Sequence, residues 1–178
     1  MRLFVAAWDD GFVDEVGRRW SEVAAGEPFR RVRAEGLHAT FAFLGEVDGA
    51  LLSRLTSAID QAASHIAPFT LALDRVGALG RDAATRVWVL RGESEAYEHA
   101  TGRIRRLLGF ALPEERRRPI PHVTLARSRD PIQVQGRPVV PPIGLTVRAI
   151  TLFESFLEPG GARYEVRHVA PLAGRPAD

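Results

Sequence analysis

The chain has 178 residues, of which 46% are hydrophobic and 26% charged, and its formal net charge is +2. This composition is typical of a globular domain, and no apolar stretch reaches the ~18 residues of a membrane span. The lack of cysteine excludes disulfides, thiolate nucleophiles and cysteine-based zinc sites. All 24 basic residues are arginine, which suits phosphate but also follows from GC-rich coding, and the small net charge gives no broad basic field for duplex DNA.

The N-terminal residues 1–8 are apolar and are followed at once by Asp9 and Asp10. The stretch is too short for a signal peptide and predicts a buried first strand. With no targeting segment, we expect a cytoplasmic protein without membrane contact. Apolar residues at helical spacing predict three helices, between Asp10 and Gly26, from Leu51 to Ala63, and from Ser94 to Gly109. Apolar or alternating runs predict strands at residues 1–8, 29–33, 37–44, 69–76, 85–90, 123–126, 145–153 and 163–169.

The remaining segments carry turn-forming or charged residues. The proline-rich residues 128–142 predict irregular chain, and the charged run 114–118 predicts a solvated loop. We expect one domain of residues 1–172, followed by a disordered tail of residues 173–178.

One short pattern occurs twice, as His38-Ala39-Thr40 and as His122-Val123-Thr124. Each copy lies on a predicted strand, where residues i and i+2 point to the same face. Each strand therefore presents a histidine and a threonine side by side. We expect the two pairs to face each other across one groove. The alternative, two solvated strand faces, is less favoured because such faces seldom select histidine.

Two histidines suit paired acid–base chemistry, in which one takes a proton from a nucleophile and the other protonates a leaving group. Phosphodiester cleavage needs these two acts on opposite sides of phosphorus. Threonine hydroxyls beside the histidines can donate hydrogen bonds to the non-bridging oxygens. A zinc site would need a third ligand, and neither a Gly-x-Ser-x-Gly turn nor a Walker loop is present.

The order of the predicted elements places a helix-bearing segment before each motif strand. This order predicts an α+β fold of two pseudo-symmetric lobes, each an antiparallel sheet with helices packed outside, flanking a central cleft.

Residues 38–45 and 121–127 resemble the paired motifs of the 2H phosphoesterase superfamily. Within it, the chain is most similar to the RNA 2′,3′-cyclic phosphodiesterases, also called 2′-5′ RNA ligases. Residues 1–6, 152–155 and 161–164 resemble the same family, so the resemblance runs from the first strand to about Leu172.

The resemblance implies hydrolysis of a terminal 2′,3′-cyclic phosphate of RNA to a 2′-phosphate, without a metal or nucleotide cofactor. It implies His38 as the proton donor to the departing 3′ oxygen and His122 as the proton acceptor that activates water. Thr40, Thr124 and Arg127 would bind the substrate phosphate. With an RNA 5′-hydroxyl as nucleophile, the reverse reaction would form a 2′-5′ bond. We expect RNA as the partner and a monomeric protein.

Arg127 fits this scheme only with a change in strand geometry. Strict alternation from His122 places it on the opposite face, so a bulge or the end of the strand must turn it into the groove.

Two other functions stay open: a phosphodiesterase for small cyclic nucleotides or ADP-ribose cyclic phosphate, and a non-catalytic RNA- or nucleotide-binding module. The remaining histidines, His65, His99 and His168, are read as structural, and Trp20 and Trp88 as core residues. The arginines that follow Phe29 could hold RNA, although a solvated edge strand explains them equally well. These are Arg30, Arg31 and Arg33.

Overall fold

The computed structural model describes residues 1–26, 28–79, 84–113, 119–159 and 161–175. Its strands are β1 (Arg2–Ala7), β2 (Arg30–Arg31), β3 (Ala39–Glu46), β4 (Phe69–Ala78), β5 (Ala84–Arg91), β6 (His122–Gln133), β7 (Arg137–Val147), β8 (Ala149–Glu158) and β9 (Gly161–Pro171). Its helices are α1 (Asp10–Arg18), α2 (Trp20–Val23), α3 (Leu52–Ala63) and α4 (Glu95–Leu107), with short 3₁₀ helices η1 (Ala34–Gly36) and η2 (Gly49–Leu51).

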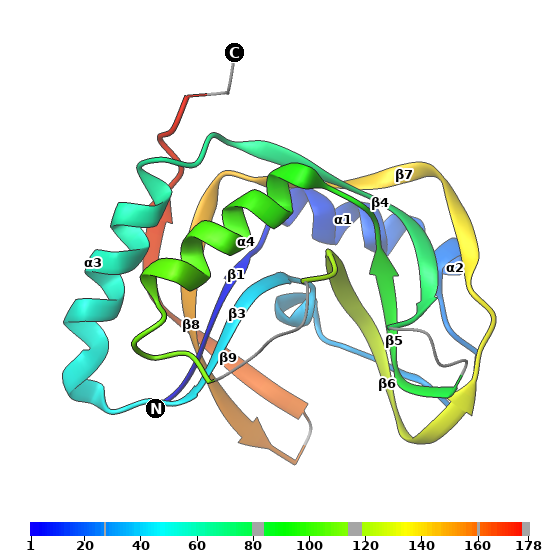
Figure 1. Cartoon of the computed structure of the whole chain (residues 1–178). Helices are drawn as coiled ribbons and strands as arrows, with labels where there is room; N and C mark the ends of the chain where they lie inside the picture. Colours follow the sequence, from blue (N-terminus) through cyan, green and yellow to red (C-terminus); the bar gives the residue numbers. More distant parts are fainter. Residues whose placement is uncertain (27, 80–83, 114–118, 160, 176–178) are drawn as a thin grey trace.

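The described strands form two antiparallel halves that meet at the motif strands. Their order is β7-β4-β5-β6-β3-β1-β8-β9, with β2 added beside β6 (Figure 1). β6 and β3 are joined by one residue pair, Val123 with Ala39. The predicted α+β fold with two lobes is therefore confirmed, and this single pair makes the two sheets continuous.

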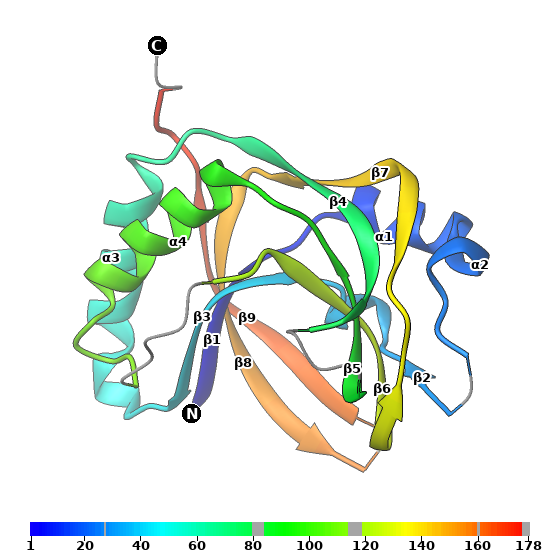
Figure 2. The ribbon, with the colours of Figure 1, turned by 45° about the vertical axis from the view of Figure 1, so that its right-hand side comes forward.

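Helices cover one face of each half. α3 and α4 pack together and against β3, β8 and β9, whereas α1 packs on β7 (Figure 2). α1 follows β1 in one half but covers the other half, and α4, which follows β5, does the reverse. This exchange of helices ties the two lobes together.

Two side chains fix where the exchanged helices begin. Asp9 accepts a hydrogen bond from the Phe12 backbone N–H at 3.2 Å, and Ser94 does the same for Tyr97 at 3.2 Å. Such caps satisfy backbone donors that have no partner inside the helix. The buried faces of both helices then join the main apolar core between the helices and the sheet.

Residues 128–142 differ from the sequence expectation of irregular chain. β6 continues to Gln133, and β7 begins at Arg137. Proline tolerates these positions because β7 is an edge strand and the outer side of β6 has no strand partner beyond Arg127 among the described residues.

The stretch 145–153, which was predicted as a single strand, is divided between two strands in the structure. It is the end of β7 and the start of β8, which belong to different halves. β7 pairs with β4, and β8 pairs with β1. Strand-like residues continue on both sides of Arg148, so the sequence pattern could not reveal the change of partner there.

The C-terminal residues remain attached to the fold up to Gly174. The Ala173 and Gly174 N–H groups donate hydrogen bonds to the Ala63 and Ile66 carbonyls, at 3.1 and 3.0 Å. Residues 173 and 174, which were predicted to belong to a disordered tail, are therefore bound to the fold. Residues 176–178 and the charged run 114–118 lie outside the described residues. No helix in the described parts of the chain is long and apolar enough to cross a membrane.

Candidate active site

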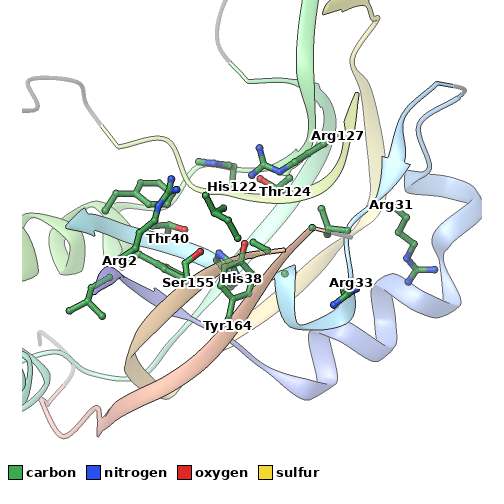
Figure 3. A pocket seen from close by; sticks show the side chains of 18 of the residues that line it. Arg2, Arg31, Arg33, His38, Thr40, His122, Thr124, Arg127, Ser155 and Tyr164 are labelled. Carbon is green, nitrogen blue, oxygen red and sulfur yellow. The ribbon is translucent and has the colours of Figure 1, made fainter. Parts of the chain in front are cut away.

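A cavity of about 630 Å³ lies where the two motif strands meet, with walls from β1, β2, β3, β6, β8 and β9. Figure 3 shows the side chains of both motifs directed into it. The structure thus brings together all five side chains that the sequence singled out. These are His38, Thr40, His122, Thr124 and Arg127.

Each motif strand contains a bulge immediately after its threonine. In β3, Thr40 and Ala42 pair with consecutive residues of β1, so Phe41 is the extra residue. In β6, Thr124 and Ala126 pair with consecutive residues of β5, so Leu125 is extra. An extra residue on one strand reverses the alternation of the side chains that follow it.

The bulges bring the fifth residue after each histidine onto the cavity wall. In β6 this residue is Arg127, so the geometry that the sequence left open is resolved in favour of the cavity. In β3 it is Phe43, whose side chain is 59% exposed. Phe43 was not predicted from the sequence, although two consecutive apolar residues after each threonine are a signal of the bulge.

Both imidazoles are oriented by backbone carbonyl groups. His38 Nδ1 lies 3.3 Å from the Glu35 carbonyl oxygen, and His122 Nδ1 lies 2.7 Å from that of Ile120. A carbonyl oxygen only accepts, so each Nδ1 carries the hydrogen and donates it. Nε2 of each ring is then the nitrogen left for proton transfer, and in the neutral ring it is unprotonated.

The protein environment favours the neutral form of both rings. The pKa of His38 is lowered to about 4, mainly by burial and to a smaller extent by the positive charge of Arg127 and the proximity of His122, against the opposing effect of the Glu35 carbonyl. Burial and Arg127 also lower the pKa of His122 below its usual value. Both histidines are thus neutral near pH 7 in the free site, and a bound anion would favour their protonation.

Three aromatic rings account for the burial of His38. Their centroids lie 4.9 Å (Phe4), 5.2 Å (Tyr164) and 6.1 Å (Phe153) from that of the imidazole. They come from β1, β9 and β8, and they form a small apolar cluster separate from the main core. The sequence stretches that carry Phe4 and Tyr164 show the family resemblance, but no local pattern indicates that they surround His38.

Tyr97 supports the first motif from behind. It is 1% exposed, its hydroxyl donates a hydrogen bond to the Thr40 carbonyl, and its ring stacks on Phe41 at 5.2 Å. Burial raises the pKa of Tyr97, so the hydroxyl keeps its proton and remains a donor. Tyr97 therefore holds the backbone of β3 at Thr40, next to the bulge that directs Phe43 to the cavity wall.

We expect Tyr97→Phe to lower the free energy of unfolding by about 1 kcal/mol, because the Thr40 carbonyl loses a buried partner. Catalytic efficiency should fall severalfold because Thr40 is then held less firmly. Urea unfolding and kcat/KM measure the two effects. Unchanged stability together with unchanged kcat/KM would remove Tyr97 from this role.

The other histidines do not line the cavity. His65 Nδ1 lies 3.1 Å from the Gln61 carbonyl oxygen, and His168 Nε2 lies 2.7 Å from Asp60 Oδ1. His99 is exposed on α4. Trp88 is buried and Trp20 packs against the core, as predicted. Among the described residues, no group of three or more His, Asp or Glu is placed to hold a metal ion.

Comparison with known proteins gives concordant matches. Residues 12–155 match the 2′-5′ RNA ligase superfamily. The chain is 32% identical over 174 residues to an RNA 2′,3′-cyclic phosphodiesterase of Geobacillus stearothermophilus, covering 90% of this chain and 54% of that protein. It therefore spans about half the length of that relative.

Solved structures share the fold over nearly the whole chain. The crystal structure of TT0787 of Thermus thermophilus has a TM-score of 0.83 and 26% identity, and the match covers 99% of this chain and 100% of that one. The crystal structure of E. coli LigT complexed with 3′-AMP has a TM-score of 0.80 and 26% identity, covering 96% and 97%.

Proposed function

Because this chain belongs to the 2′-5′ RNA ligase superfamily, we propose that it hydrolyses the terminal 2′,3′-cyclic phosphate of RNA to a 2′-phosphate. The observation that carries the proposal is the matched pair of imidazoles. Each has Nδ1 on a backbone carbonyl, and both line one cavity with the two threonines. The Geobacillus relative, named an RNA 2′,3′-cyclic phosphodiesterase, supports the choice of substrate.

The reaction uses the two Nε2 atoms in turn. Neutral His122 takes a proton from water, and the water oxygen forms a bond to phosphorus. The bond between phosphorus and the 3′ oxygen breaks, and protonated His38 gives its proton to that oxygen, so the product keeps the phosphate on the 2′ oxygen. His122 then returns its proton to solvent, and His38 regains one.

Charge at phosphorus is stabilised by the residues beside the histidines. In this proposal Thr40 and Thr124, which line the cavity, donate hydrogen bonds to the non-bridging oxygens, and Arg127 supplies the positive charge. With an RNA 5′-hydroxyl in place of water, the same steps join two ends through a 2′-5′ bond. The proposal assigns every proton transfer to the two histidines and needs no metal ion.

The low pKa of His38 gives a specific pH dependence. The pH dependence of kcat/KM reports the free enzyme, where the pKa values are about 4 for His38 and below 6.5 for His122. The bell-shaped pH profile of kcat/KM should therefore have its maximum below pH 6.5. kcat reports the complex, where the phosphate anion favours both imidazolium forms and raises both pKa values. We therefore expect the pH profile of kcat to have its maximum at a higher pH than that of kcat/KM. Coincident profiles, or the reverse order, would refute paired histidine catalysis of this kind.

Two alternatives to this function would use the same site. A phosphodiesterase for small cyclic nucleotides or ADP-ribose cyclic phosphate would turn over its substrate without any gain from a longer RNA. A non-catalytic RNA- or nucleotide-binding module would bind the cyclic end and yield no product. The intact histidines and threonines in both motifs favour an enzyme over that module.

A further inference from the structure

The cavity is lined by more positive charge than one phosphate requires. No Asp or Glu of the described chain lines it, whereas five arginines do. A cyclic phosphate carries one negative charge, for which Arg127 and two threonines are sufficient. The remaining four are Arg2, Arg30, Arg31 and Arg33.

β2 places two of these arginines beside the catalytic strand. Its pairing with β6 sets Arg30 directly opposite Arg127, and the Val32 N–H extends the contact by donating to the Leu125 carbonyl at 2.9 Å. Like charges opposite each other on neighbouring strands destabilise a sheet. A bound polyanion would offset this repulsion.

Arg31 differs from its neighbours. Its guanidinium lies over the Trp20 ring, 4.1 Å from the centroid, and Figure 3 shows the side chain extending toward the helices. Although Arg31 lines the cavity, this cation–π contact holds its guanidinium against Trp20. Arg30 and Arg33 are therefore the β2-side arginines whose charge is available along this wall, and neither has an ion-pair partner among the described residues.

We propose that Arg30 and Arg33 bind backbone phosphates of the nucleotides on the 5′ side of the cyclic end, so that the preferred substrate is a single-stranded RNA of several nucleotides. This inference rests on the proposed function. A strand that terminates in the cyclic phosphate continues only on its 5′ side, so one strand leaves the cavity, next to Arg127. A positively charged groove that follows the backbone is how proteins bind single strands.

The test compares kcat/KM for a 2′,3′-cyclic mononucleotide and for oligonucleotides of increasing length with the same cyclic end. For wild type, kcat/KM should rise over the first few nucleotides. Arg30→Gln/Arg33→Gln should lower kcat/KM about tenfold for a long substrate, through KM, and leave the mononucleotide unchanged. The slope of log(kcat/KM) against log salt should become shallower by about 1.4, at ~0.7 per phosphate contact.

The matched control, Arg106→Gln/Arg148→Gln, removes the same charge outside the cavity and should behave like wild type. Equal loss on the mononucleotide would overturn the inference while leaving the proposed function intact. No gain with length in wild type would also overturn the inference, and it would favour a phosphodiesterase for small cyclic nucleotides. If no cyclic end is hydrolysed at any length, the proposed function fails. Anisotropy binding of an RNA with a 3′-hydroxyl end then still reports whether the Arg30/Arg33 variant binds the strand less tightly than wild type.

Discussion

Replacing either histidine with alanine is expected to lower kcat for a cyclic-phosphate RNA by roughly 10²- to 10⁴-fold. In the proposed mechanism each replacement removes an Nε2 that transfers a proton, and the contacts of Nδ1 with the Glu35 and Ile120 carbonyls leave each Nε2 for that role. The double variant His38→Ala/His122→Ala should be little worse than either single one, because the two groups act in one step. Steady-state and single-turnover rates measure the effect.

These variants need a control that separates a loss of stability from a loss of catalysis. His38→Ala leaves a space among Phe4, Phe153 and Tyr164, so a larger polar replacement, His38→Gln, separates lost packing from lost chemistry. Both His38 variants should be similarly inactive, while His38→Gln keeps more of the wild-type stability in urea. Turnover near the wild-type level in any well-folded variant would contradict the roles proposed for the histidines.

Arg127→Ala is expected to lower kcat/KM by roughly 10- to 100-fold, the effect of losing a charged contact to phosphate. It also has a second consequence that a merely structural residue would lack. Arg127 lowers the pKa of both His38 and His122, so its removal raises both values. Both limbs of the kcat/KM profile should therefore move to higher pH.

Arg127→Lys provides the matched comparison, because it keeps the charge and loses the planar fork. It should retain the wild-type pH limbs while losing part of the catalytic efficiency. If Arg127→Ala leaves both limbs in place, Arg127 does not act on the histidines. If it leaves kcat/KM unchanged as well, Arg127 does not bind the phosphate.

The sequence contained enough information to predict that the two motifs share one cavity. A strand sets residues i and i+2 on one face, so the repeated His-x-Thr pattern predicted two matched pairs, and the structure places all four side chains in one cavity. Alternation failed beyond the threonines. The bulges at Phe41 and Leu125 carry Phe43 and Arg127 onto the cavity wall, and an extra residue in a strand depends on pairing with a distant partner.

Non-local contacts limited the remaining prediction. The rings around His38 come from strands at both ends of the chain, and Tyr97 reaches Thr40 from a helix 57 positions away. Apolar patterns mark such residues as buried but do not say which part of the core they occupy. Arg30 and Arg33 are exposed, as the interpretation of a solvated edge strand expected, but the sequence could not place them at the site, because only the pairing of β2 with β6 brings them to the cavity.

The most direct test of the central claim is the position of the phosphate in the product. Wild-type protein is incubated, with EDTA present, with an oligonucleotide that ends in a 2′,3′-cyclic phosphate, and the product is identified by ³¹P NMR against reference 2′- and 3′-phosphates. We expect complete conversion to the 2′-phosphate, because His38 protonates the 3′ oxygen as it leaves. A 3′-phosphate product, or a substrate that stays cyclic, would contradict the account.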